Sequence, residues 1–105
     1  VALVRKAREV LGTTAKLRVD PNGAWTPATA KRMIAKLAPF DLQYIEQPLP
    51  VEDIAGGARL AASSQIPICI DEGAYTLQET MTAIRLGHIQ LELFLSKGFL
   101  GVVRL

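Results

Sequence analysis

Three acidic residues follow short apolar segments of the chain, and their spacing is regular. Asp20, Glu46 and Asp71 are separated by 26 and 25 residues. If these segments are neighbouring parallel strands, their carboxyl ends share one edge and the three carboxylates converge there. Carboxylates that meet in this way repel one another, and a bound cation removes the conflict. Oxygen ligands with room for water and substrate suit Mg²⁺, or Mn²⁺, better than Zn²⁺.

Each acid taken alone also has an ordinary explanation. Asp20 precedes the turn sequence Pro-Asn-Gly at 21–23, where an aspartate is usually a turn former. Glu46 precedes Gln-Pro and is equally consistent with a solvated strand end. The common spacing of all three acids, each beside turn residues, is what favours a metal site.

Helical and strand patterns alternate along the chain. We predict helices over 1–11, 26–38, 52–64 and 76–87, strands over 16–20, 42–46, 66–71 and 89–95, and a further helix from 98. Thr26 is expected to cap the second helix, with Pro27 at its first position. Regular alternation of short strands and helices indicates parallel βα units joined by right-handed crossovers.

Two α/β architectures fit this order, the eight-stranded barrel and the open doubly wound sheet. No glycine-rich phosphate loop follows any predicted strand, which argues against a nucleotide-binding open sheet. Four strands are half of a closed barrel, with two unpaired edges. Its inner face, expected to include Val19, Ile45 and Ile70, would lack opposing strands. We therefore expect the isolated chain to dimerise, aggregate or remain partly unfolded.

The composition is that of an ordinary globular domain. The 105 residues are 50% apolar and carry a net charge of +2, too small an excess to indicate nucleic acid or a membrane surface as partner. No segment reaches the roughly 18 apolar residues that span a bilayer. The single cysteine, Cys69, excludes an internal disulfide and lies in an apolar run. A reducing, cytoplasmic location fits this composition.

Three stretches are similar to motifs of the mandelate racemase and muconate-lactonizing branches of the enolase superfamily. They are Leu-Arg-Val-Asp-Pro-Asn-Gly-Ala-Trp at 17–25, Tyr-Ile-Glu-Gln-Pro-Leu at 44–49 and Pro-Ile-Cys-Ile-Asp-Glu at 67–72. The resemblance implies a partial TIM-like (β/α)7β barrel of about four βα units, corresponding to family strands 3 to 6. Residues 1–105 would then be a fragment of the C-terminal metal-binding domain, with the N-terminal capping domain absent.

The same resemblance implies roles for individual residues. Asp20, Glu46 and Asp71 match the Mg²⁺ ligands, and Asn22 and Glu72 match accessory positions near the metal. The implied reaction is removal of a proton α to a carboxylate, with a Lys or His base. Cycloisomerases, racemases or epimerases, and o-succinylbenzoate synthases fit it. The substrate would be a small carboxylate or an N-acylamino acid, and full-length relatives are often homo-oligomers.

Glu-Gln-Pro followed by Asp-Glu is more similar to the muconate-lactonizing branch than to the mandelate racemase branch. The lysines of the muconate-lactonizing branch are not reproduced. A Lys-x-Lys pair is expected one βα unit before Asp20, which would place it upstream of Val1. A second lysine is expected on the strand at 89–95, where Phe94 stands instead; Lys97 matches only if the alignment is shifted. Two hypotheses stay open, an enzyme segment and a catalytically inactive remnant that at most binds a divalent cation. In either case we expect no turnover by the isolated chain.

Overall fold

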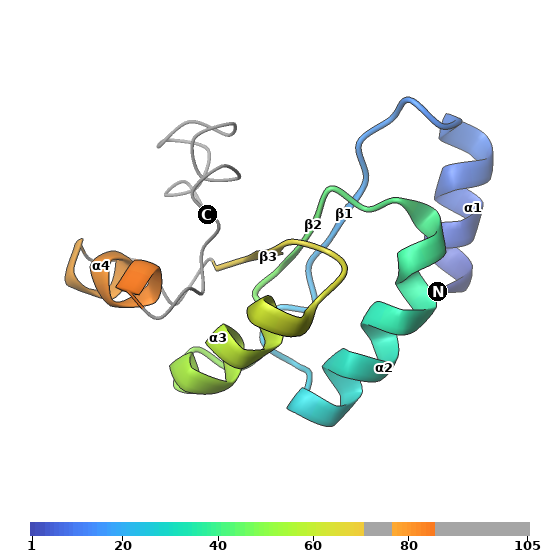
Figure 1. Ribbon diagram of the computed structural model, residues 1–105. Coiled ribbons are helices and arrows are strands. Elements are labelled where there is room, and N and C mark those ends of the chain that lie inside the picture. Colours follow the sequence, from blue (N-terminus) through green and yellow to red (C-terminus); the bar gives the residue numbers. More distant parts are fainter. Residues whose placement is uncertain (71–76, 86–105) are drawn as a thin grey trace.

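The structure is a computed structural model that describes residues 1–70 and 77–85 (Figure 1). Four helices, one 3-10 turn and three strands occur there. In chain order they are α1 (Ala2–Leu11), β1 (Arg18–Val19), α2 (Pro27–Leu37), η1 (Ala38–Phe40), β2 (Tyr44–Glu46), α3 (Ile54–Ser63), β3 (Ile68–Cys69) and α4 (Leu77–Arg85).

The three strands form a parallel sheet in the order β1-β2-β3. A helix connects each strand to the next, α2 between β1 and β2 and α3 between β2 and β3, and these two helices pack against each other. The predicted parallel α/β alternation is therefore confirmed over this part of the chain. The predicted strand at 89–95 and the helix from 98 lie outside the described residues.

Side-chain caps set the starts of α2 and α3. The Thr26 hydroxyl accepts a hydrogen bond from the backbone N–H of Thr29 at 3.2 Å, and Pro27 occupies the first helical position, as predicted. The Asp53 carboxylate accepts from the N–H of Gly56 at 2.9 Å, so α3 begins at Ile54. That start is two residues later than the sequence pattern indicates, because Asp53 caps the helix rather than entering it.

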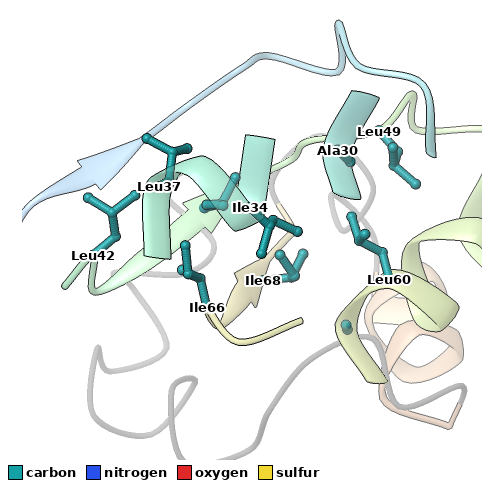
Figure 2. Packing of buried hydrophobic residues seen from close by; sticks show 10 residues of the cluster. Ala30, Ile34, Leu37, Leu42, Leu49, Leu60, Ile66 and Ile68 are labelled. Carbon is teal, nitrogen blue, oxygen red and sulfur yellow. The ribbon is translucent and has the colours of Figure 1, made fainter. Parts of the chain in front are cut away.

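The hydrophobic core lies between α2, α3 and the strands (Figure 2). Helices α2 and α3 each contribute the buried apolar residues of one helix face to this core. The buried cluster comprises Ala30, Ile34, Leu37, Leu42, Ile45, Leu49, Leu60, Ala61, Ile66 and Ile68. Trp25 is half-buried and packs against the cluster, and Tyr44 is buried.

The expected inner face requires a correction. Ile45 is fully buried within the core cluster, and Val19 packs against that cluster, so both face the helices. Ile70 is buried too, with 2% of its surface exposed. Side chains alternate between the two faces of a strand, so the face away from the helices belongs to Arg18 and Asp20, the neighbours of Val19.

Hydrogen bonds from Arg8 connect α1 to the segments that lead into β1 and β2. Its Nε and Nη2 donate to the carbonyl oxygen of Phe40 at 3.0 and 2.9 Å, and Nη2 also donates to the carbonyl of Asp41 at 3.0 Å. Its Nη1 donates to the carbonyls of Gly12 and Ala15 at 2.9 and 2.6 Å. One guanidinium thus joins two chain segments that are far apart in sequence.

The rest of α1 is poorly covered. None of its residues is buried, and Leu3, Val10 and Leu11 are 82, 69 and 54% exposed. A groove of about 380 Å³ separates α1 from β1, whose described strand partner is β2. Elsewhere, the thiol of Cys69 is buried. Over residues 1–70 and 77–85, no helix combines the length and apolar character needed to cross a membrane.

Candidate metal centre

Asp20 and Glu46 stand in the same row at the carboxyl end of the sheet. Val19 of β1 pairs with Ile45 of β2 in parallel register, so the next residues, Asp20 and Glu46, lie opposite each other. Neighbouring strands are about 4.7–4.9 Å apart, and residues in one row share a face. Since Ile45 faces the helices, both carboxylates are on the opposite face, with Asp20 exposed and Glu46 half-buried.

The third strand continues this row. Glu46 pairs with Cys69 of β3, which places Cys69 beside the two carboxylates on the same face. The third predicted ligand, Asp71, comes two residues after Cys69 in the sequence. Asp71 and its neighbour Glu72 lie outside the described residues.

The register therefore places two of the three predicted ligands at the ends of adjacent strands. Within residues 1–70 and 77–85, no three His, Cys, Asp or Glu side chains gather closely enough to hold a metal ion. Phe94 and Lys97, on which the prediction of a base depends, also lie outside these ranges. The pair Asp20 and Glu46 is thus the described part of the candidate centre.

Asp20 also has the turn-forming role that its sequence context predicts. Its Oδ1 accepts a hydrogen bond from the backbone N–H of Asn22 at 2.8 Å, and Asn22 takes a left-handed conformation with φ of 56°. This bond orients the carboxylate at the strand end. The two explanations for Asp20 are compatible, because a carboxylate has acceptor capacity beyond one N–H bond.

Backbone hydrogen bonds join the turn after β1 to the turn after β2. The N–H of Gly23 donates to the carbonyl of Gln47 at 2.7 Å, and the N–H of Trp25 donates to the carbonyl of Pro48 at 3.0 Å. The N–H of Gln47 in turn donates to the carbonyl of Cys69 at 2.7 Å, which extends the connection to β3. These bonds fix the segments that directly follow the two acids.

Gln47 is the residue of this region that the sequence did not reveal. It is 3% exposed, its φ is 38°, and its Nε2 donates to the carbonyl of Leu49 at 2.9 Å. Left-handed backbone is uncommon for a residue other than glycine, asparagine or aspartate. The Glu-Gln-Pro motif marked the place, but no pattern in the sequence indicates this conformation.

A positive charge lies two rows before the acids, on the same face of the sheet. Arg18 pairs with Tyr44 in the register of β1 and β2, and its guanidinium lies over the Tyr44 ring, 5.3 Å from the centroid. Its Nε donates to Oε1 of Gln43 at 2.9 Å. The ion pair found in the described part of the chain is remote from the site; it joins Lys6 and Glu9 on α1 at 3.8 Å. The Asp20 carboxylate is therefore not neutralised by a described cation.

Comparisons with known proteins identify the family of the chain. Residues 1–103 match the family described as "Enolase C-terminal domain-like". An N-succinylamino acid racemase from Amycolatopsis sp. is 44% identical over 88 residues, which are 84% of this chain and 24% of that protein. The chain therefore spans about a quarter of the length of this relative.

Solved structures give the same result. A mandelate racemase/muconate lactonizing family protein from Azoarcus sp. EbN1 superimposes with a TM-score of 0.82 at 38% identity, covering 85% of this chain and 24% of that one. An enolase from Bradyrhizobium complexed with magnesium and mandelic acid has a TM-score of 0.78 at 37% identity, with coverage of 83 and 24%. A similar parallel α/β segment thus occurs in a structure that is complexed with magnesium.

Proposed function

The chain belongs to the enolase C-terminal domain-like family, and from that premise we propose that it carries the divalent-metal site of an enzyme that removes a proton α to a carboxylate. The proposed ligands are Asp20, Glu46 and Asp71, with Asn22 and Glu72 beside them. The cation is Mg²⁺, and Mn²⁺ has the same preference for hard oxygen ligands.

The parallel register is the observation that carries this proposal. It sets Asp20 opposite Glu46 on the face away from the helices, at the edge where β strands of such folds present their functional groups. A strand that stayed extended past Cys69 would present the residue two positions later on the same face, and that residue is Asp71. Two carboxylates and a third from the next strand form a donor set that fits Mg²⁺.

The residues of this chain would bind and orient the reactants. A cation at this site would stabilise the negative charge that develops on the substrate carboxylate as the proton leaves. Asp20 is kept in place by the N–H of Asn22, and Glu46 by the strand hydrogen bonds on both sides of β2. Lys97 is the candidate proton acceptor in this chain if the shifted alignment holds.

We further propose that residues 1–105 are part of the C-terminal barrel, family strands 3 to 6, of a longer enzyme. Racemases, epimerases, cycloisomerases and o-succinylbenzoate synthases are among the relatives. The proposed substrate is a small carboxylate or an N-acylamino acid. We propose that the full-length enzyme is a homo-oligomer in the cytoplasm and that it does not bind nucleic acid.

The second candidate function is a catalytically inactive remnant that at most binds a divalent cation. The observation that favours it is Phe94, which occupies the position where the resembled branch has a lysine. A positioned acid–base group is typically worth about 10²–10⁴-fold in rate, so its loss would lower turnover by about that factor. Both candidates are compatible with metal binding by the isolated chain.

The test is a calorimetric titration of the chain with Mg²⁺. Asp20→Asn, Glu46→Gln and Asp71→Asn should each weaken binding, whereas Glu9→Gln, which removes an exposed acid on α1, should leave it unchanged. Wild-type binding no tighter than that of the three ligand variants would refute the metal centre.

A second assay separates the two candidate functions. The chain is incubated in D₂O with N-succinylamino acids and Mg²⁺, and deuterium uptake at Cα is followed. Exchange above a no-protein control that disappears in Lys97→Met would establish an active base in this chain. We expect no exchange by residues 1–105 alone.

A further inference from the structure

The helix pair α2 and α3 carries basic residues and no acidic ones. Helix α2 contains Lys31, Arg32 and Lys36, and α3 contains Arg59, whereas neither helix contains an aspartate or a glutamate. All four basic residues are exposed. The net charge of the whole chain is only +2 because the acidic residues lie in other segments. Positive charge is therefore concentrated on the surface that these two helices form.

A groove lies between the two helices. It consists of two adjacent hollows of about 270 and 240 Å³, which share Lys31, Leu60 and Ser63 in their linings. One hollow reaches Gly56 in the first turn of α3, and the other reaches Gln65, just beyond the end of that helix. The 10 residues of α3 rise about 15 Å at 1.5 Å per residue. The groove is thus long enough for a segment of peptide, and a single small anion would fill only part of it.

The floor of this groove is apolar and its margins are cationic. Ile34 and Leu60, which are 6% and 3% exposed, line the groove and also belong to the core (Figure 2). Lys31 from α2 and Arg59 from α3 are the exposed cations that line it from the two helices. Over residues 1–70 and 77–85, no ion pair or side-chain hydrogen bond engages either cation. Both charges are therefore available to a partner.

We propose that this groove binds an acidic peptide segment of another protein, with carboxylates beside Lys31 and Arg59 and an apolar side chain over Ile34 and Leu60. Charge complementarity sets the sign of the occupant, because a neutral or basic segment would form no ion pair with the two cations. An apolar centre with a charged margin is also the usual anatomy of a protein interface. The surface lies on the helices and is independent of the proposed metal site.

Fluorescence anisotropy of the whole chain with a labelled peptide tests the proposal. The probe is a repeating Glu-Glu-Leu peptide, which presents carboxylates beside apolar side chains. It should bind, and its affinity should fall as ionic strength rises, because salt screens exposed ion pairs. Two peptides of the same length serve as controls. The Gln-Gln-Leu repeat lacks the charge and the Glu-Glu-Ser repeat lacks the apolar side chain, so each should bind more weakly.

Substitutions locate the binding surface. Lys31→Gln and Arg59→Gln should each weaken binding of the Glu-Glu-Leu peptide about two- to five-fold, the range expected for an exposed ion pair. Lys6→Gln removes an exposed cation from α1 and should leave the affinity unchanged. Ala35→Trp fills the groove without changing the charge and should weaken binding. Ala28→Trp adds the same bulk at an exposed position of α2 outside the groove and should bind like wild type.

Four results would overturn the proposal. Equal affinity for the Gln-Gln-Leu and Glu-Glu-Leu peptides would remove the role of charge. Equal weakening by Lys6→Gln and Lys31→Gln would reduce the effect to the net charge of the chain. Wild-type affinity in Ala35→Trp would place the peptide outside the groove. Tighter binding of single-stranded DNA than of the acidic peptide, lost in Arg59→Gln, would assign the groove to nucleic acid instead.

Discussion

The conformation of Gln47 offers a test in which two substitutions at one position should differ in a defined direction. The residue has a φ of 38° and is buried between the turns that follow β1 and β2. Its backbone groups bond to Gly23 and Cys69, and any substitution other than proline preserves those bonds. Its side chain also donates a hydrogen bond, from Nε2 to the carbonyl of Leu49.

These contacts set the expected magnitudes. Gln47→Ala leaves the Leu49 carbonyl without this buried donor, which costs about 1–3 kcal/mol of unfolding free energy. Gln47→Gly loses the same bond but also relieves the left-handed backbone, which costs a non-glycine residue about 1–2 kcal/mol. The glycine variant should therefore be more stable than the alanine variant by about 1 kcal/mol, or about 4–8 °C in Tm.

Thermal unfolding followed by circular dichroism, at one protein concentration, measures the difference. Lys36 in α2 provides the control, because it is exposed and lies within a helix. There the order reverses, and Lys36→Gly should be less stable than Lys36→Ala by about 1 kcal/mol. If the glycine variant is the less stable one at both positions, the strain assigned to Gln47 does not exist. If Gln47→Ala matches wild type within about 0.5 kcal/mol, the bond to Leu49 contributes nothing measurable.

Three other predictions follow from contacts elsewhere in the fold. Arg8→Met should lower the unfolding free energy by about 2–4 kcal/mol in urea titrations, because hydrogen bonds from a charged donor to carbonyls are lost. Arg8→Lys should lower it by about half as much. Arg5→Met removes a contact with the Phe40 ring and should lower it by less than about 1 kcal/mol. Asp53→Ala should cost about 1 kcal/mol in thermal melts through loss of the α3 cap, and Asp53→Asn much less. Light scattering should show association that grows with concentration and is reduced by Leu3→Glu, since Leu3 is 82% exposed; a monodisperse 11.4 kDa wild-type species would contradict this.

The helices and the strand order could be predicted because their signals are local. Thr26-Pro27 is a start signal in itself, and the apolar spacing of residues 1–11 is complete within one helix. The strands are shorter than their apolar segments, with two residues in β1 where five were predicted. Strand length depends on hydrogen bonds to a neighbour, which the pattern of one segment does not encode.

The interactions that hold the candidate site could not be predicted for the same reason. Arg8 contacts Phe40 across 32 residues and Arg18 contacts Gln43 across 25, so neither pair appears in any local window. The register that sets Asp20 opposite Glu46 was predictable in outline, because spacing of one βα unit places both at strand ends. The face of the sheet on which the apolar residues lie was not predictable, and Ile45 was assigned to the wrong face.

Hydrogen bonds at both ends of the β1–β2 pair explain how such short strands can hold two carboxylates in one row. Where the chain enters the strands, Arg8 binds carbonyls of Ala15 and Phe40, one from each entering segment. Where it leaves them, the N–H of Gly23 binds the carbonyl of Gln47. Only two register pairs connect the strands between these points, so the bonds at the two ends must resist slippage that the strands alone would allow. A one-residue slip would turn Asp20 towards the core, and the placement of the candidate ligand therefore depends on residues that touch no metal.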